Sequence, residues 1–267
     1  MKRAWMGPLV VAGLASLVAC STPRPAPGSA GNRDLPTVSD QTNADKRAQV
    51  RLELAGAYFS RGQTATALDE VKLALAAKPD MPEALNLRGL IYAALGEARF
   101  AEDSFKRAQQ LAPGNGDVMH NYGWFLCQER RFDEAEAQFR QALAQPTYLD
   151  TVRTQLAMGV CQARAGKLAE AEATLTRAYE IDPSNPLSAF SLGDVLYRRG
   201  EYERVRFYMR RVNSIPSQAN AQSLWLAARA EQRLGNFAGA QQLGNQLRDR
   251  FPQSPEAVQF DRGRFDD

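Results

Sequence analysis

Residues 121–135, which read NYGWFLCQERRFDEA, contain the pattern that decides the fold. Residues 87–101 repeat it upstream as LRGLIYAALGEARFA, and residues 157–171 repeat it downstream as AMGVCQARAGKLAEA. Each stretch has glycine at its third position, a turn residue seven positions later and alanine five positions after that. A period of this length indicates a chain of similar structural units, each too small to bury a core alone.

The pattern recurs six times at a spacing of 34 residues, with two short insertions. The windows are 48–81, 82–115, 116–149, 152–185, 186–219 and 221–254. Shared positions carry a small residue before the turn (Ala55, Gly89, Gly123, Gly159, Gly193, Ala228), the turn residue itself (Gly62, Gly96, Arg130, Gly166, Gly200, Gly235) and a proline near the end of each window. Small residues let two helices approach closely, and proline ends a helix.

The repeated unit resembles the tetratricopeptide repeat, two antiparallel helices joined by a tight turn. The resemblance implies an all-α fold, a right-handed superhelical solenoid of six tetratricopeptide repeats over residues 46–254, followed by a C-terminal tail over 255–267. No alternating apolar run demands a sheet. A stacked solenoid offers an extended concave face for binding another protein.

The N-terminus predicts a targeting signal. Lys2 and Arg3 precede an apolar run over 9–19, which is too short to cross a bilayer core of about 30 Å as a helix. The run ends at Ala19-Cys20, which resembles the bacterial lipoprotein box. The resemblance implies a signal peptide over 1–19, lipid attachment at Cys20 and, because Ser21 follows, localisation in the outer membrane facing the periplasm. The alternative is an ordinary secretory signal with a chance cysteine.

Residues 20–45 are expected to form a flexible tether. This stretch holds several prolines and glycines among small polar residues, a composition that cannot build a core. The tether would let the repeats stand clear of the membrane to which the lipid is anchored.

Composition narrows the class of protein. Of 267 residues, 44% are hydrophobic and 24% charged, so the chain as a whole is not disordered. A net charge of +3 gives no argument for nucleic acid. One histidine and three cysteines argue against a metal site, and no phosphate-binding loop or nucleophile motif is present. We therefore expect a protein that is not an enzyme, with no cofactor, no metal and no small-molecule substrate.

In repeats of this kind, five positions of the first helix face the groove. Over repeats one to three they give an apolar set, Leu52, Phe59, Leu90 and Trp124, which is our candidate partner-binding groove. Further groove positions are Leu156, Val160, Phe190, Tyr197 and Trp225, and the polar or charged Asn86, His120, Arg153, Arg164, Asp194, Arg198, Arg229 and Arg233. The later groove is richer in arginine, so the earlier repeats better match an apolar segment. Packing between repeats is the alternative for any one of these residues.

The fifth repeat carries an unusual density of arginine. Six arginines between positions 198 and 211 face two glutamates, an excess that could meet an acidic partner or phospholipid headgroups. A solvated helix face is the simpler interpretation.

Cys127 and Cys161 occupy nearly the same level on the first helices of repeats three and four. The periplasm is oxidising, and lipid would consume Cys20, which leaves an even pair. We predict a disulfide between them, with two buried free thiols as the alternative.

The third repeat and its continuation carry a sharper resemblance. Residues 121–127 (NYGWFLC), 131–135 (RFDEA), 142–148 (ALAQPTY) and 158–161 (MGVC) resemble the PilF/PilW family of type IV pilus biogenesis lipoproteins, which act as pilotins. The chain departs from the family at Ala157-Met158, where asparagine–alanine is usual. The resemblance implies that the partner is the secretin, whose subunits the protein helps to reach or assemble in the outer membrane. A lipoprotein scaffold for outer-membrane protein insertion or cell-wall synthesis stays the alternative.

Overall fold

The computed structural model describes residues 38–265, with side chains from Asn43 onward. These residues form thirteen α-helices and no strand. The helices are α1 (Val38–Ser60), α2 (Thr64–Ala77), α3 (Pro82–Ala94), α4 (Ala98–Leu111), α5 (Gly116–Gln128), α6 (Phe132–Leu143), α7 (Thr151–Arg164), α8 (Leu168–Ile181), α9 (Pro186–Arg198), α10 (Tyr202–Asn213), α11 (Ala221–Arg233), α12 (Phe237–Arg250) and α13 (Pro255–Asp261). The all-helical prediction is confirmed.

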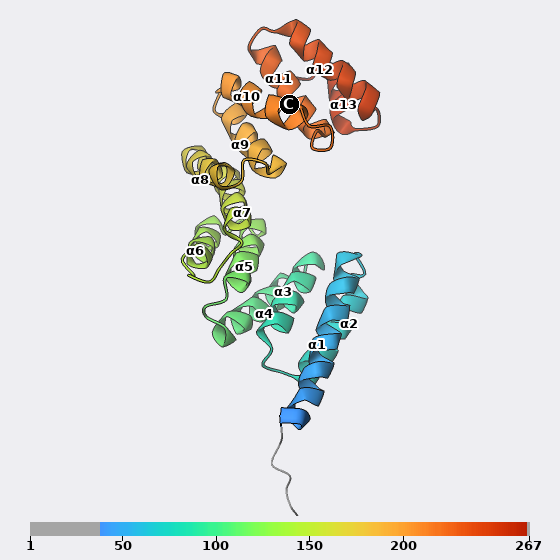
Figure 1. The fold of residues 1–267 in the computed structure, drawn as a ribbon, viewed down its shortest axis with the longest axis vertical. Helices are drawn as coiled ribbons and strands as arrows, with labels where there is room; N and C mark the ends of the chain where they lie inside the picture. The colour runs from blue at the N-terminus through green and yellow to red at the C-terminus, as the bar shows by residue number, and fades with distance from the viewer. Residues whose placement is uncertain (1–37, 266–267) are drawn as a thin grey trace, which may run out of the picture. The chain divides into compact units, whose positions relative to one another are not determined.

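The helices stack in chain order, as Figure 1 shows for α1 to α13. From α2 onward, each helix packs against the next. The first helices of neighbouring repeats also touch, from α3 to α5, α5 to α7, α7 to α9 and α9 to α11. This second set of contacts places the first helices side by side along one face, which is the face that the groove positions share.

The small residues of the repeat allow the two helices of a unit to meet. A Cβ atom added at Gly89 of α3 would lie 2.7 Å from the ring of Phe105 on α4. A Cβ atom at Gly193 of α9 would lie 2.9 Å from the terminal methyl of Met209 on α10. Phe105 and Met209 are completely buried. Each large side chain therefore fills the space that glycine leaves open, which explains why the two residue types recur in register.

The turn between the two helices of a repeat needs a left-handed backbone. Gly96 and Gly166 have φ values of 77° and 81° at this position. In the third repeat the position is Arg130, with φ of 62°, the only non-glycine residue with positive φ in the described chain. A side chain in this region costs energy because Cβ crowds the backbone, so Arg130 is a strained substitute for glycine.

Both ends of the repeat region differ from the sequence-based boundaries. Helix α1 begins at Val38, within the expected tether over 20–45. The expected C-terminal tail contains α13, which packs on α11 and α12 and places Phe260 opposite Gly244. Cys20 and the signal peptide lie outside the described residues. No helix within residues 38–265 is long and apolar enough to span a membrane.

Candidate functional site

The four apolar groove residues are all half-buried. Leu52 and Phe59 pack against the core that α1, α2 and α3 share, and Leu90 and Trp124 pack against the core around Phe105 and Tyr122. Each of them therefore contributes to packing between helices and still exposes part of its side chain. The surface that remains can contact a partner without any change of fold.

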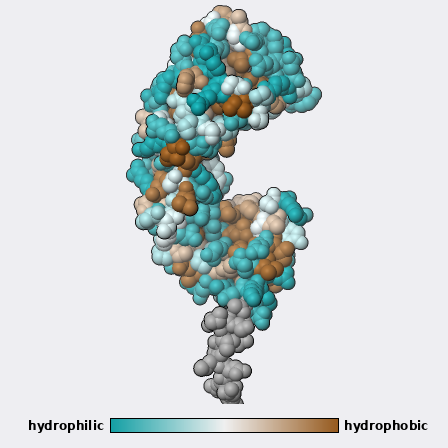
Figure 2. Space-filling model, in the orientation of Figure 1, coloured by the Kyte–Doolittle hydropathy of each residue, from teal (hydrophilic) through white to brown (hydrophobic). Residues whose placement is uncertain are grey.

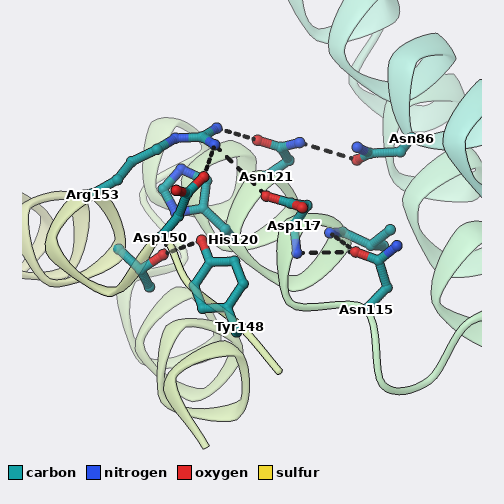
Figure 3. Close-up of polar contacts among 10 residues, drawn as sticks. Asn86, Asn115, Asp117, His120, Asn121, Tyr148, Asp150 and Arg153 are labelled. Carbon is teal, nitrogen blue, oxygen red and sulfur yellow. Dashed lines mark hydrogen bonds and ion pairs between the residues drawn. The ribbon is translucent and has the colours of Figure 1, made fainter. Parts of the chain in front are cut away.

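A row of polar side chains crosses the first helices of repeats two to four (Figure 3). Asn121 of α5 donates from Nδ2 to Oδ1 of Asn86 on α3, at 3.3 Å. Arg153 of α7 donates from Nη2 to Oδ1 of Asn121, at 3.1 Å. We call Asn86, Asn121 and Arg153 the polar row. It joins three consecutive repeats through side chains, so it fixes their relative position where the groove passes from apolar to basic.

Two carboxylates hold the end of this row. Arg153 Nη1 lies 3.7 Å from Asp117 Oδ1 and 3.5 Å from Asp150 Oδ2. All three side chains are exposed, so these ion pairs contribute little to stability on their own. Both carboxylates contact the same guanidinium that donates to Asn121. The repeat phase predicts groove positions at Asn86 and Arg153 but not at Asn121, which lies one position after the slot that His120 fills.

His120 does not face the groove. It is buried with 5% of its surface exposed, and its Nδ1 lies 2.8 Å from Oγ1 of Thr154. The hydroxyl of Tyr148 lies 2.6 Å from the same Thr154 oxygen. Burial, with a smaller contribution from the charge of Arg153, lowers the pKa of His120 to about 4. The imidazole is therefore neutral near pH 7 and acts as a packed hydrogen-bonding group between α5 and α7.

The chain itself covers the groove at the sixth repeat. Trp225, expected in the groove, is 8% exposed, and the ring of Phe265 lies 5.2 Å from its own. Arg229 donates from Nε to the carbonyl of Phe265 at 3.1 Å and lies over the ring of Tyr197 at 4.4 Å. Phe265, which follows α13, therefore covers two groove positions of the last repeat, Trp225 and Arg229. Trp225 and Arg229 are not free partner contacts in this conformation.

A disulfide joins Cys127 at the end of α5 to Cys161 on α7, with their Cα atoms 5.8 Å apart. Both cysteines are almost completely buried. The bond links the first helices of repeats three and four, the same two helices that Asn121 and Arg153 connect.

Three of the six arginines of the fifth repeat, Arg199, Arg204 and Arg206, form ion pairs with glutamates. Arg204 lies 2.6 Å from both Glu172 and Glu201, and Arg206 contacts Glu203 and Glu231. The excess of positive charge is therefore smaller in the fold than along the sequence.

Over residues 43–265, no group of histidine, cysteine, aspartate and glutamate could hold a metal ion.

The surface offers several small apolar areas. Figure 2 shows brown residues in separate patches divided by teal ones on the face in view. A partner would therefore be held by a few apolar contacts with polar contacts between them, as in many protein interfaces.

Comparison with known proteins agrees with this architecture. A tetratricopeptide repeat model matches residues 52–116 and 126–186, and a second matches 222–254. The type IV pilus assembly protein PilF of Pseudomonas aeruginosa is 26% identical over 216 residues, which cover 81% of this chain and 85% of that protein.

Two solved structures are similar over most of the chain. The crystal structure of PilW, a widely conserved type IV pilus biogenesis factor, is 29% identical with a TM-score of 0.74, covering 80% of this chain and 97% of the other. The structure of Pseudomonas aeruginosa pilF has 24% identity and a TM-score of 0.70, over 83% and 100% of the two chains, and it supports the fold. The chain therefore belongs to the tetratricopeptide repeat family and is homologous to PilF and PilW.

Proposed function

We propose that this protein is an outer-membrane lipoprotein needed for type IV pilus biogenesis, and that it binds secretin subunits through its groove to promote their localisation and assembly. The observation that carries the proposal is the likeness to PilF and PilW, two proteins of type IV pilus biogenesis, over about four-fifths of the chain. A solenoid of helix pairs supports it, because such a fold serves binding and provides no catalytic machinery by itself.

The candidate groove supplies the binding energy in this account. Phe59 and Trp124 each retain exposed surface beside a packed core. Burying one large apolar side chain contributes roughly 1.5–3 kcal/mol, so a few such contacts hold an apolar segment. We expect secretin subunits that await membrane insertion to expose apolar segments of this kind. The neighbouring polar row, Asn86, Asn121 and Arg153, would orient the bound segment through hydrogen bonds.

The lipid supplies localisation. Acyl chains on Cys20 would hold the protein at the inner leaflet of the outer membrane, since each buried methylene contributes about 0.8 kcal/mol. Subunits bound to an anchored protein are concentrated at the membrane, which favours their assembly by effective concentration. No covalent bond is made or broken in this mechanism.

Membrane fractionation tests the anchor. We expect Cys20→Ala to leave the protein outside the outer-membrane fraction, while the neighbouring Thr22→Ala control fractionates as the wild type does. Unchanged fractionation of Cys20→Ala would refute the lipid anchor.

A deletion strain tests the role in the cell. We expect secretin in that strain to be mislocalised or to remain unassembled, and a plasmid copy of the wild-type protein to restore both properties. If secretin reaches the outer membrane and assembles normally without this protein, the proposed function is wrong. A scaffold for another envelope complex then becomes the better hypothesis.

A further inference from the structure

One face of α10, the second helix of the fifth repeat, combines arginine with an exposed aromatic side chain. An open hollow of about 590 Å³ runs along this face. Its lining residues follow the helical period along α10 and just beyond its end: Glu203, Arg206, Phe207, Arg210, Arg211 and Ser214. Three of the six are arginines and one is a glutamate, so the face carries a net positive charge. Phe207 lies on the same face with 60% of its surface exposed.

A second hollow, of about 330 Å³, adjoins the first between α10 and α12 and shares Arg210 with it. These two helices both pack on α11 and do not contact each other. One repeat earlier, Tyr179 of α8 occupies the corresponding space, with its ring 5.1 Å from the ring of Tyr208 on α10. The residue 34 positions after Tyr179 is Asn213, which is too small to do the same. The space beside Arg210 therefore stays open.

The acidic groups of the two hollows are held by one arginine, and two other arginines have no acidic partner. Arg206 lies 2.9 Å from Glu203 and 2.6 Å from Glu231. Glu231 is 7% exposed, and the hydrogen bond from Arg206 is the main cause that holds its pKa below the ordinary value. Among residues 43–265, no hydrogen bond or ion pair within 4 Å involves the guanidinium of Arg210 or Arg211. Both side chains are exposed, so two guanidinium groups are available to an anion.

A surface with anionic groups in front of an apolar layer suits this face. The guanidinium groups of Arg210 and Arg211 can donate to phosphate oxygens, and Phe207 can enter the apolar layer behind the phosphates. A folded acidic protein would need an interface of ordinary size around these three residues. A phospholipid surface needs only anionic charge and depth. A chain that is already tethered to that surface gains a fixed orientation from a weak contact.

We propose that the face of α10 formed by Phe207, Arg210 and Arg211 docks on the phosphate layer of a membrane that contains anionic phospholipid. The proposal rests on the lipid anchor of the proposed function, because two arginines and one aromatic ring bind a membrane only weakly on their own. The face belongs to a second helix, whereas the groove positions belong to first helices, so docking leaves the groove open. It would hold the groove at a fixed orientation to the membrane.

Vesicle sedimentation of residues 21–267 tests the docking apart from the anchor, since this chain lacks Cys20 and the apolar run before it but keeps every residue that the structure describes. The vesicles are phosphatidylcholine alone or an equal mixture of phosphatidylcholine and phosphatidylglycerol. We expect binding to the mixture to be at least ten-fold stronger and to weaken as salt is added. Arg210→Ala combined with Arg211→Ala should weaken this binding at least ten-fold.

The matched control combines Lys106→Ala with Arg107→Ala. These residues occupy the same two positions in α4 of the second repeat, but they form ion pairs with Glu102 and Asp80. The two double variants therefore lose the same net charge and differ in which face loses it. We expect the control to bind the anionic vesicles nearly as the wild type does. All four substituted side chains are exposed, so both double variants should keep the melting temperature of the wild type.

A fluorescence measurement checks that the aromatic side chain enters the membrane. We expect lipids with brominated acyl chains to quench Phe207→Trp more than they quench the wild type. Leu73→Trp, at an exposed apolar position of α2, should show no added quenching.

Three results would each overturn the proposal: equal binding to the two kinds of vesicle, an equal loss in the two double variants, or no added quenching of Phe207→Trp. Binding of polyglutamate that depends on Arg210 and Arg211, without a preference for anionic vesicles, would also overturn it and assign the face to an acidic protein. The chain in this assay has no anchor. Failure here therefore leaves the fractionation test of Cys20→Ala valid, and failure of that test leaves the vesicle result valid.

Discussion

Reduction of the disulfide between Cys127 and Cys161 should destabilise the repeats substantially. The bond closes a loop across a sequence separation of 34 residues. A cross-link that closes a loop of this length lowers the conformational entropy of the unfolded chain and so stabilises the fold by on the order of 4 kcal/mol. Reduction removes this stabilisation. In a domain of this size, each kcal/mol of lost stability lowers the melting temperature by roughly 2–4 °C. We therefore expect reduction to lower the melting temperature by about 8–16 °C. Because repeats contact only their neighbours, the loss should fall at the junction of repeats three and four.

Urea unfolding with and without reductant measures this effect. We expect a lower midpoint in the reduced protein and a broader or split transition as the two halves of the solenoid uncouple. The double variant Cys127→Ala with Cys161→Ala serves as the control, because its midpoint should not respond to reductant. Two free thiols titrated in the unfolded, unreduced protein would refute the disulfide, and an unchanged midpoint on reduction would refute its stabilising role.

Three further predictions concern single positions in the repeats. Arg130→Gly should raise the free energy of unfolding by about 0.5–1 kcal/mol in a urea titration, because glycine adopts the positive φ of this turn without strain. Gly89→Val should lower it by roughly 1–3 kcal/mol, because its Cβ would meet the ring of Phe105. The pKa of His120 is lowered to about 4 in the folded protein, against 6.5 for an ordinary histidine. Between pH 6.5 and pH 4 the unfolded chain therefore binds a proton at His120 that the folded protein does not bind. Stability should therefore fall between pH 6.5 and 4, by up to on the order of 3 kcal/mol, with a flatter dependence in His120→Gln.

The period of the sequence was enough to predict the helix pairs, because the spacing of small residues reflects a packing requirement. Gly89 and Phe105 occupy fixed positions in their repeat, and the ring of Phe105 fills the space that Gly89 leaves without a side chain. The same reasoning failed at His120. His120 contacts Thr154, which in turn contacts Tyr148, and these two residues flank the two-residue insertion between the third and fourth windows, where the repeat phase shifts.

The C-terminal end shows a second limit of the periodic pattern. Helix α13 lies beyond the last window, and Phe265 covers Trp225 through a turn that no repeat contains. The sequence does contain a helix-start signal at this point, a capping residue followed by proline. Ser254 and Pro255 begin α13 in the same way that Asn185 and Pro186 begin α9. Side-chain hydrogen bonds between repeats, such as the polar row, depend on distances that repeat phase alone does not determine.

Affinity of the purified chain for secretin subunits tests the central claim most directly. We expect Phe59→Ala and Trp124→Ala each to weaken binding ten-fold or more, since 1.4 kcal/mol corresponds to one decade and each residue buries a large apolar surface. Arg229→Ala, at the covered end of the groove, should leave affinity unchanged, and near-normal melting temperatures of all three variants would show that the fold is intact. Full affinity in both aromatic variants, together with loss of binding in Arg229→Ala, would contradict the account and place the partner at the basic end.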